Sequence, residues 1–433
     1  MKKFATVILS SSLLISIGLP SESSGQLSQI VITGKVVDKT SEESLPYATI
    51  SIKGKSIGVV SNQMGEFTFK FSDQYMKDTL TVSMLGYETY KYKIQDIESR
   101  DNLLVALDMK AIMLNEVVIT DTKLSAKKII EKAILNIKIN YPQQPYLLEG
   151  FYRDFKKENE KYIGLLEAAV SIYDKGYVTS PKHSAQLKEE VYLIEIRKSK
   201  TADYKARIYK ILNLLSSMLL TNDVKYGSGD RGTFDVRNTK YELEKSIYLD
   251  AQLVYVIRTE FPWMCRIFVD AQSFAILEIE MDARWEGVHK NEWKMNDSIM
   301  NRTPYIKKTI KFKKYAGKYF MEYMSYTWRI EGFKKGSENT LFTSDFFQEL
   351  LINNIILKDV QKPARGNKMS DTKILELQTK PYNEAFWKAY NIIRDSPLSQ
   401  KIIKDLEQAG ALENQFKNGG AEKNEPRKSR KKI

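Results

Sequence analysis

The chain has 433 residues, of which 42% are hydrophobic and 11% aromatic, so it is long enough for two or three domains with their own cores. Its single cysteine, Cys265, excludes an intrachain disulfide. The formal net charge of +13 favours an acidic partner. Aromatic residues recur in alternating stretches, so we predict a mainly β fold with some α-helix.

The first 25 residues are typical of a secretory signal peptide. Lys2 and Lys3 precede the apolar stretch Phe4–Leu19, and small residues suit cleavage after Gly25. The alternative is a membrane anchor, but serines interrupt this stretch, which is shorter than the ~20 apolar residues of a spanning helix. We expect an exported protein, in the periplasm or associated with the outer membrane, that meets anionic lipid or polysaccharide and no nucleic acid.

Residues 26–110 are predicted to form a small β-sandwich. Short strand-like runs follow one another at near-regular spacing with turn residues between them. Phe67, Phe69 and Phe71 alternate, so one face of their strand is expected to enter the core. The predicted strands are 30–38, 47–53, 59–61, 65–71, 80–84, 87–94 and 103–107.

A family resemblance rests on the same residues. The segments Gly34–Asp38, Leu45–Ile50, Gly65–Phe67 and Leu85–Tyr87 resemble the carboxypeptidase-regulatory-like domain, which has a transthyretin-like β-sandwich fold. Gly65 suits a tight turn, and Gly86 permits a positive φ between two strands. The resemblance covers this first domain only, and it implies a module without catalytic residues.

Residues 111–145 are predicted as a linker strand and a helix. Leu114–Thr120 resembles the stretch that follows the same module in TonB-dependent outer-membrane receptors. The rest of the chain lacks the repeated alternating segments that a large barrel requires, so this resemblance implies the compartment and not transport. Ser125–Tyr141 has apolar residues at helical spacing, with Ser125 as a candidate N-cap.

Residues 146–350 are predicted to form a larger antiparallel β domain with helical inserts. One insert is a helix expected over Tyr204–Leu220. The segments Phe268–Asp270 and Ala275–Glu280 resemble periplasmic carriers of the LolA and LolB type, whose curved, incomplete barrel holds acyl chains. This resemblance implies an apolar or amphipathic ligand; an open half-barrel, a closed barrel and a sandwich all remain open.

Residues 351–412 are predicted as a C-terminal segment with helices. Pro397 suits the start of a helix that we expect over Ser399–Ala409. Phe386, Trp387 and Tyr390 form an aromatic stripe at helical spacing, which we expect to pack on the β domain. Residues 413–433 are predicted as a basic, disordered tail that offers a contact to an anionic membrane surface.

No catalytic, cofactor-binding or metal-binding residue is predicted. The two histidines are His183 and His289; the latter has a His-x-x-Glu spacing with Glu292, but a zinc site needs another histidine downstream and none follows. Cys265 lies in strand-like sequence and is expected to be a core residue. Gly227–Gly232 matches Gly-x-Gly-x-x-Gly, but a helix precedes it and a strand follows, the reverse of a dinucleotide site.

Four carboxylates keep an enzyme hypothesis open. Glu278, Glu280, Asp282 and Glu286 are close in sequence, and the first three share one face of a predicted strand. Such a face is usually solvated, so we do not assign them as catalytic.

The sequence favours a non-catalytic envelope protein that binds, carries or assembles. Its partner would be a cell-envelope protein or an amphipathic or lipid ligand. The first alternative is a carboxylate-based hydrolase acting on cell-wall or glycan substrates. The second is a structural partner of a TonB-dependent transport complex.

Overall fold

The computed structural model describes residues 28–110, 124–177, 187–199, 214–227, 234–249, 252–260, 264–284, 292–370, 374–395 and 397–418. Several sequence predictions lie outside these ranges. They concern the signal peptide, Leu114–Thr120, both histidines, Glu286, the glycine loop after Gly227 and the tail beyond 418.

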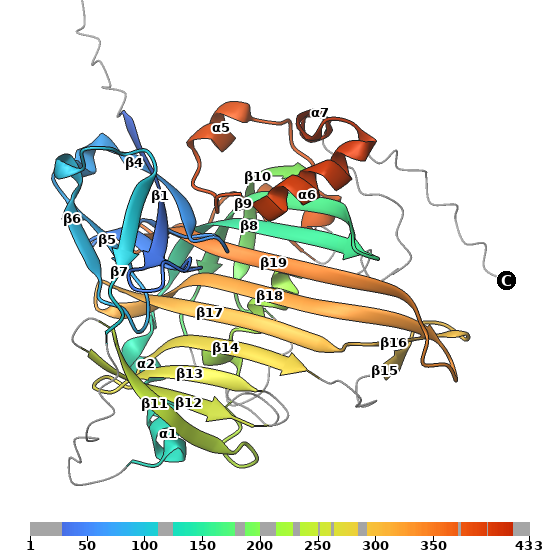
Figure 1. The fold of residues 1–433 in the computed structure, drawn as a ribbon, viewed down its shortest axis with the longest axis horizontal. Coiled ribbons are helices and arrows are strands. Elements are labelled where there is room, and N and C mark those ends of the chain that lie inside the picture. Colours follow the sequence, from blue (N-terminus) through green and yellow to red (C-terminus); the bar gives the residue numbers. More distant parts are fainter. Residues whose placement is uncertain are drawn as a thin grey trace, which may run out of the picture.

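The first domain is the predicted β-sandwich (Figure 1). One sheet has the order β4-β1-β7 and the other β3-β2-β5-β6. All neighbours are antiparallel except β1 and β7, which are parallel. The strands are β1 Gln29–Asp38, β2 Thr49–Ile52, β3 Gly58–Val60, β4 Glu66–Ser72, β5 Thr79–Ser83, β6 Tyr90–Lys93 and β7 Leu103–Leu107, with 3₁₀ turns at Asp73–Tyr75 and Ile94–Asp96.

The sandwich core follows from strand alternation and from close backbone approach. The three alternating phenylalanines of β4 are buried, as the sequence predicted. Gly34 lies where β1 meets β7, and a Cβ there would stand 2.3 Å from the Leu103 carbonyl oxygen. Gly86 has a φ of +85°, which confirms the positive φ expected there, and Gly65 in its tight turn has a φ of +74°.

The second domain is built on one 12-stranded antiparallel sheet. Its main path is β10-β9-β8-β19-β18-β17-β14-β13-β12-β11, and the short β15 and β16 pair beside β18. The fold is therefore mainly β with α, as predicted. The strands are β8 Tyr146–Glu158, β9 Lys161–Asp174, β10 Glu190–Lys198, β11 Tyr241–Leu249, β12 Gln252–Thr259, β13 Cys265–Asp270, β14 Ile276–Arg284, β15 Glu292–Lys294, β16 Ile299–Arg302, β17 Tyr305–Tyr315, β18 Lys318–Lys334 and β19 Thr340–Ile356.

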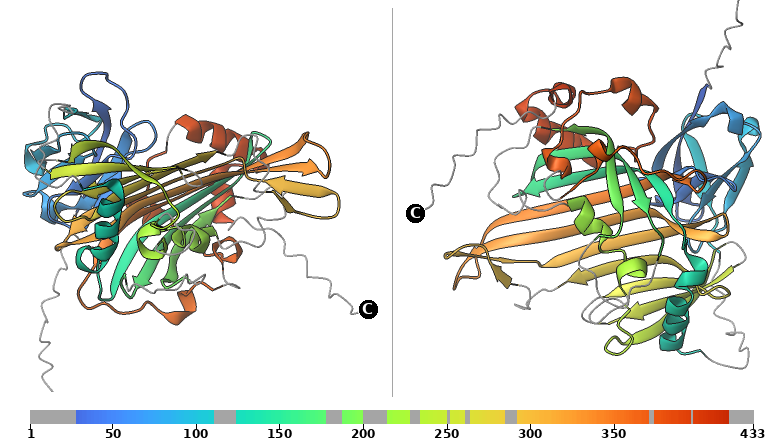
Figure 2. Two further views of the ribbon diagram at one scale, coloured as in Figure 1. Left: turned by 90° about the horizontal axis from the view of Figure 1, so that it is seen from below. Right: turned by 180° about the vertical axis from the view of Figure 1, so that it is seen from behind.

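Different elements cover the two faces of this sheet (Figures 1 and 2). The inner face packs against α1–α4 and forms the largest apolar core. The outer face carries the sandwich and α5–α7, whose apolar residues join those of the sheet. The helices are α1 Ala126–Leu135, α2 Ile137–Asn140, α3 Leu214–Leu219, α4 Asp223–Tyr226, α5 Glu384–Ala389, α6 Pro397–Leu406 and α7 Leu412–Lys417, with 3₁₀ turns at Arg365–Asn367, Leu375–Leu377 and Glu407–Ala409.

The helices test several local predictions. The Ser125 hydroxyl accepts a hydrogen bond from the Lys128 amide, so the predicted N-cap is confirmed. The predicted helix is divided into α1 and α2 at Asn136. Of the helix expected over Tyr204–Leu220, the described residues contain α3.

Two boundaries differ from the sequence prediction. Strand β19 continues past residue 350 to Ile356. The first residues assigned to a disordered tail instead belong to α7, where Gln415 and Phe416 are buried. The reason is packing, because Phe416 joins a small core with Leu165 and Leu406. Within the described ranges, no helix is long and apolar enough to cross a membrane.

Candidate functional site

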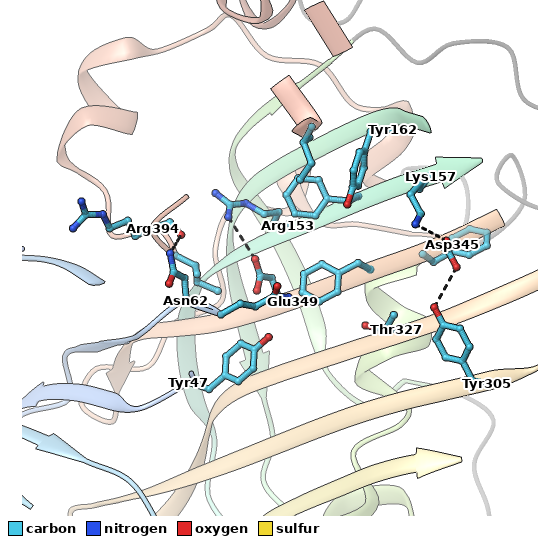
Figure 3. Close-up of a pocket in the computed structure, with 16 residues that line it drawn as sticks. Tyr47, Asn62, Arg153, Lys157, Tyr162, Tyr305, Thr327, Asp345, Glu349 and Arg394 are labelled. Atoms are coloured by element: carbon cyan, nitrogen blue, oxygen red, sulfur yellow. Dashed lines mark hydrogen bonds and ion pairs between the residues drawn. The ribbon is translucent and has the colours of Figure 1, made fainter. Parts of the chain in front are cut away.

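A groove opens on the outer face of the large sheet, between the sandwich and α6 (Figure 3). Its volume is about 210 Å³. The sandwich provides one wall, strands β8, β17, β18 and β19 provide the floor, and the segment that leads into α6 provides the other wall. We call it the central groove. Its lining includes Tyr47, Gln63, Arg153, Phe155, Lys157, Tyr162, Tyr305, Thr327, Asp345, Phe347, Glu349 and Arg394.

Strand alternation places the floor residues. Successive side chains of a strand point to opposite faces, so every second residue of β8 and of β19 faces the groove. Phe155 and Phe347 are register partners, and their rings stack with centroids 6.0 Å apart. Lys157 Nζ lies 3.2 Å from Asp345 Oδ2 at one end of this aromatic floor. The floor is therefore apolar in the middle and charged at its margin.

Tyr47 closes the groove on the sandwich side. Its backbone φ is +60°, a value that residues other than glycine rarely adopt. Two contacts hold it there: its ring stacks on Tyr323 at 5.1 Å, and its carbonyl accepts a hydrogen bond from Lys311 Nζ at 2.9 Å. Burial raises the pKa of its hydroxyl to about 12, so the hydroxyl stays protonated at neutral pH.

Arg153 is a buried cation at the base of the groove. Its guanidinium lies 2.6 Å from Glu167, 2.9 Å from Asp395 and 3.5 Å from Glu349. Glu167 also accepts from Arg197 Nε at 2.5 Å. Burial alone would raise the pKa of Glu167, but the two guanidinium groups lower this pKa below its ordinary value. This cluster joins β8, β9, β10 and β19 to the C-terminal segment and fixes the shape of the groove.

Two carboxylates of β19 face the groove, and their pKa values are shifted in opposite directions. Burial raises the pKa of Glu349 to about 7, against the opposing charge of Arg153. The pKa of Asp345 is lowered, because hydrogen bonds and charge from Arg329 and Lys157 outweigh its burial. The two residues are four apart on one strand, so they stand roughly 13 Å apart. Paired catalytic carboxylates of glycosidases stand about 5–9.5 Å apart, so this geometry does not form such a pair.

A second, larger hollow continues the central groove across the sheet. Its volume is about 700 Å³, and it shares Tyr47, Gln63, Thr327 and Phe347 with the central groove. Strands β12, β13, β14 and β17 line the rest of it. The two hollows therefore adjoin, and we call them together the channel. The added lining is strongly charged, with Arg258, Arg266, Glu280, Asp282 and Lys307.

The predicted carboxylate cluster lies beside this channel. Glu278, Glu280 and Asp282 share the outer face of β14. The expectation of a solvated face is wrong for Glu278, which is buried 3.5 Å from Lys311. Burial raises its pKa to about 7. The sequence could not show this, because its partner Lys311 lies on another strand and also donates a hydrogen bond to the Tyr47 carbonyl, in a distant part of the chain.

Other candidate residues lie as follows. Cys265 is buried in the large core, as predicted. Gly227 ends α4, and Glu292 lies on β15. Within the described ranges no three His, Cys, Asp or Glu side chains gather as a metal site would require.

Sequence reasoning missed Arg153, Glu349 and Asp345. A signal for them exists in hindsight. At every second position of residues 151–157 and 345–349, charged and aromatic side chains alternate: Phe151, Arg153, Phe155 and Lys157 on one strand, and Asp345, Phe347 and Glu349 on the other. A charge inside such a strand needs a buried partner, which indicates a second covered face.

Comparison with known proteins supports the prediction for the first domain. Residues 32–119 match the family model described as the CarboxypepD_reg-like domain. The sandwich is a carboxypeptidase-regulatory-like domain. The search of curated proteins gave no match.

Solved structures show weak similarity to this chain. A LolA superfamily protein from Nitrosomonas europaea is 13% identical, with 55% of this chain and 96% of that chain covered and a TM-score of 0.21. A putative outer membrane lipoprotein-sorting protein domain from Vibrio parahaemolyticus is 10% identical, with coverage of 55% and 95% and a TM-score of 0.24. A putative membrane-associated protein from Bacteroides fragilis is 14% identical, with coverage of 76% and 99% and a TM-score of 0.15. These scores are too low to support a functional assignment.

Proposed function

We propose that this protein is a non-catalytic binding protein of the cell envelope, and that it holds an extended segment of another envelope protein in the channel on its outer face. The observation that carries the proposal is the channel itself. It joins the central groove to the charged hollow beside it and is walled by both domains.

The lining favours a polypeptide. An extended chain presents side chains alternately to its two sides, so an apolar residue on the aromatic floor would have polar neighbours at the rim. The rim offers both charge signs close together, as in the pair Lys157 and Asp345. Hydroxyl and amide groups of Thr327 and Gln63 stand where the two hollows meet, within reach of a peptide backbone. A purely apolar acyl chain would offer no hydrogen bond to the Thr327 hydroxyl.

The compartment and the lack of catalysis rest on other observations. The leader-like residues 1–25 and the regulatory-like sandwich support an envelope location. The separation of Asp345 from Glu349 argues against a hydrolytic carboxylate pair.

The test is a peptide-binding measurement with the full-length mature chain. An array of extended peptides identifies a binder, and calorimetry gives its Kd. Thr327→Arg places a bulky side chain where the two hollows meet, and we expect Kd to rise at least tenfold. The matched control is Lys93→Glu, on an exposed residue of β6 away from the channel, and it should leave Kd unchanged.

Three results would count against the proposal. The first is a peptide that binds Thr327→Arg as tightly as the wild type. The second is an array without binders combined with tight binding of cell-wall glycans. The third is turnover of wall fragments that Glu349→Gln abolishes, which would establish the hydrolase alternative instead.

A further inference from the structure

Helices α1 and α2 carry an exposed stripe of mixed lysine and aliphatic residues. Lys128, Lys132, Leu135 and Ile139 follow one another at spacings of four, three and four residues, which places them on one side of a helix. The backbone stays close to helical across Asn136, with φ −87° and ψ 0°. Leu135 is 69% exposed and Ile139 57% exposed.

The opposite side of α1 and α2 packs against the large sheet. Its apolar residues are buried in the large core, so the outward pair is not needed for folding. The two outward aliphatic side chains lie one helical turn apart, so they present a small apolar tip to any surface that meets these helices. The buried set is Ala126, Ile129, Ile130, Ala133 and Ile137.

The surroundings of the aliphatic pair are basic. Residues 126–140 contain four lysines and one acidic residue, Glu131. The hairpin between β17 and β18 adds Lys314 and Lys318, and Lys318 Nζ donates a hydrogen bond to the Ile139 carbonyl. Lys132 Nζ lies 4.7 Å from the centre of the Phe274 ring. An aliphatic tip ringed by lysines complements a surface that is apolar inside and anionic outside.

We propose that this lysine–aliphatic patch, formed by α1, α2 and the β17–β18 hairpin, docks the protein on an anionic lipid surface. Leu135 and Ile139 enter the boundary between headgroups and acyl chains, and the lysines contact the headgroups. The patch lies on the side of the sheet opposite the sandwich and α6 (Figure 2). Docking therefore leaves the channel open to solution, and the inference is independent of what the channel binds.

The test is co-sedimentation of the full mature chain with lipid vesicles. Vesicles that contain phosphatidylglycerol are compared with vesicles of phosphatidylcholine alone. We expect binding to the anionic vesicles that weakens as salt is raised above about 0.1 M, because headgroup attraction is screened. The double variant Leu135→Ser/Ile139→Ser should lower the partition coefficient about tenfold or more, since each side chain loses its transfer from water.

Two further variants make the outcome specific. Lys128→Glu/Lys138→Glu should weaken binding to anionic vesicles at least tenfold. Leu377 is 68% exposed and lies beside β10, at the opposite edge of the sheet from β11 and α1, so Leu377→Ser should not change binding. The proposal is overturned if wild-type protein does not bind anionic vesicles, or binds neutral ones equally. It is also overturned if both patch variants bind as well as wild type, which would assign the attraction to the basic residues 417–433.

Discussion

Replacing Glu349 with glutamine removes one buried charge from the base of the central groove while keeping its size. Glu349 lies 3.5 Å from Arg153, and the hydroxyl of Tyr323 stands 3.4 Å from its other oxygen. Burial is the dominant influence on this carboxyl and raises its pKa from 4.5 to about 7. Arg153 keeps two other carboxylate partners in the variant, so the substitution does not leave it unpaired.

The sign of the effect follows from proton binding. Between pH 4.5 and about 7 the folded protein holds a proton on Glu349 that the unfolded chain releases, so the free energy of unfolding falls as pH rises. A shift of this size corresponds to about 3 kcal/mol at full ionisation. Glutamine resembles the protonated form and does not titrate. We therefore expect Glu349→Gln to match wild type at pH 4 and to exceed its stability by about 3 kcal/mol at pH 8.

Urea unfolding measures the effect. At each pH the free energy of unfolding of the wild type is subtracted from that of the variant. The control Glu280→Gln makes the same substitution at a half-exposed residue on the same side of the sheet. The free energy of unfolding of this control should stay within about 0.5 kcal/mol of the wild-type value at every pH. The stability difference between Glu349→Gln and wild type could instead be independent of pH, or increase as the pH falls. Either result would show that burial does not keep this carboxyl protonated.

Two further substitutions test the packing that shapes the groove. Gly34→Ala puts a methyl group against the Leu103 carbonyl, so it should lower the free energy of unfolding by about 3 kcal/mol. A lower urea midpoint would show this loss, and wild-type stability would contradict the close approach of β1 and β7. Trp387→Ala removes a buried ring that packs edge-on against Phe151 at 6.4 Å, and should cost about 3–5 kcal/mol. We expect earlier proteolytic cleavage near residue 390 in this variant, and unchanged cleavage would indicate that α5 is held by other contacts.

Local patterns predicted much of the fold. The alternating phenylalanines, the turn glycines and the Ser125 cap each act over a few residues, so one stretch of sequence contains the information. The course of the large sheet is different. Strand β8 pairs with β19, nearly 200 residues further along the chain, and no short-range pattern specifies that register.

The candidate site could not be predicted for the same reason. Arg153 and Glu349 are meaningful only as a pair, and Asp395 joins them from the C-terminal segment. The aromatic stripe shows a partial success: Trp387 packs on Phe151 of the β domain as expected. It also joins the sandwich core, a contact that periodicity cannot reveal.

The contacts between the domains change how the sandwich should be understood. A freely tethered adaptor would meet the rest of the chain through few contacts. Here Lys311 and Lys313 of β17 donate hydrogen bonds to carbonyls of the sandwich, and Thr49 donates to Glu322 at 2.7 Å. From the C-terminal side, the carbonyl of Asp395 accepts a hydrogen bond from Asn62 at 3.3 Å. The sandwich is therefore fixed from two directions, and it forms one wall of the channel. Substitutions at Thr49, Lys311 or Lys313, which do not line the channel, should therefore alter the peptide binding that we propose.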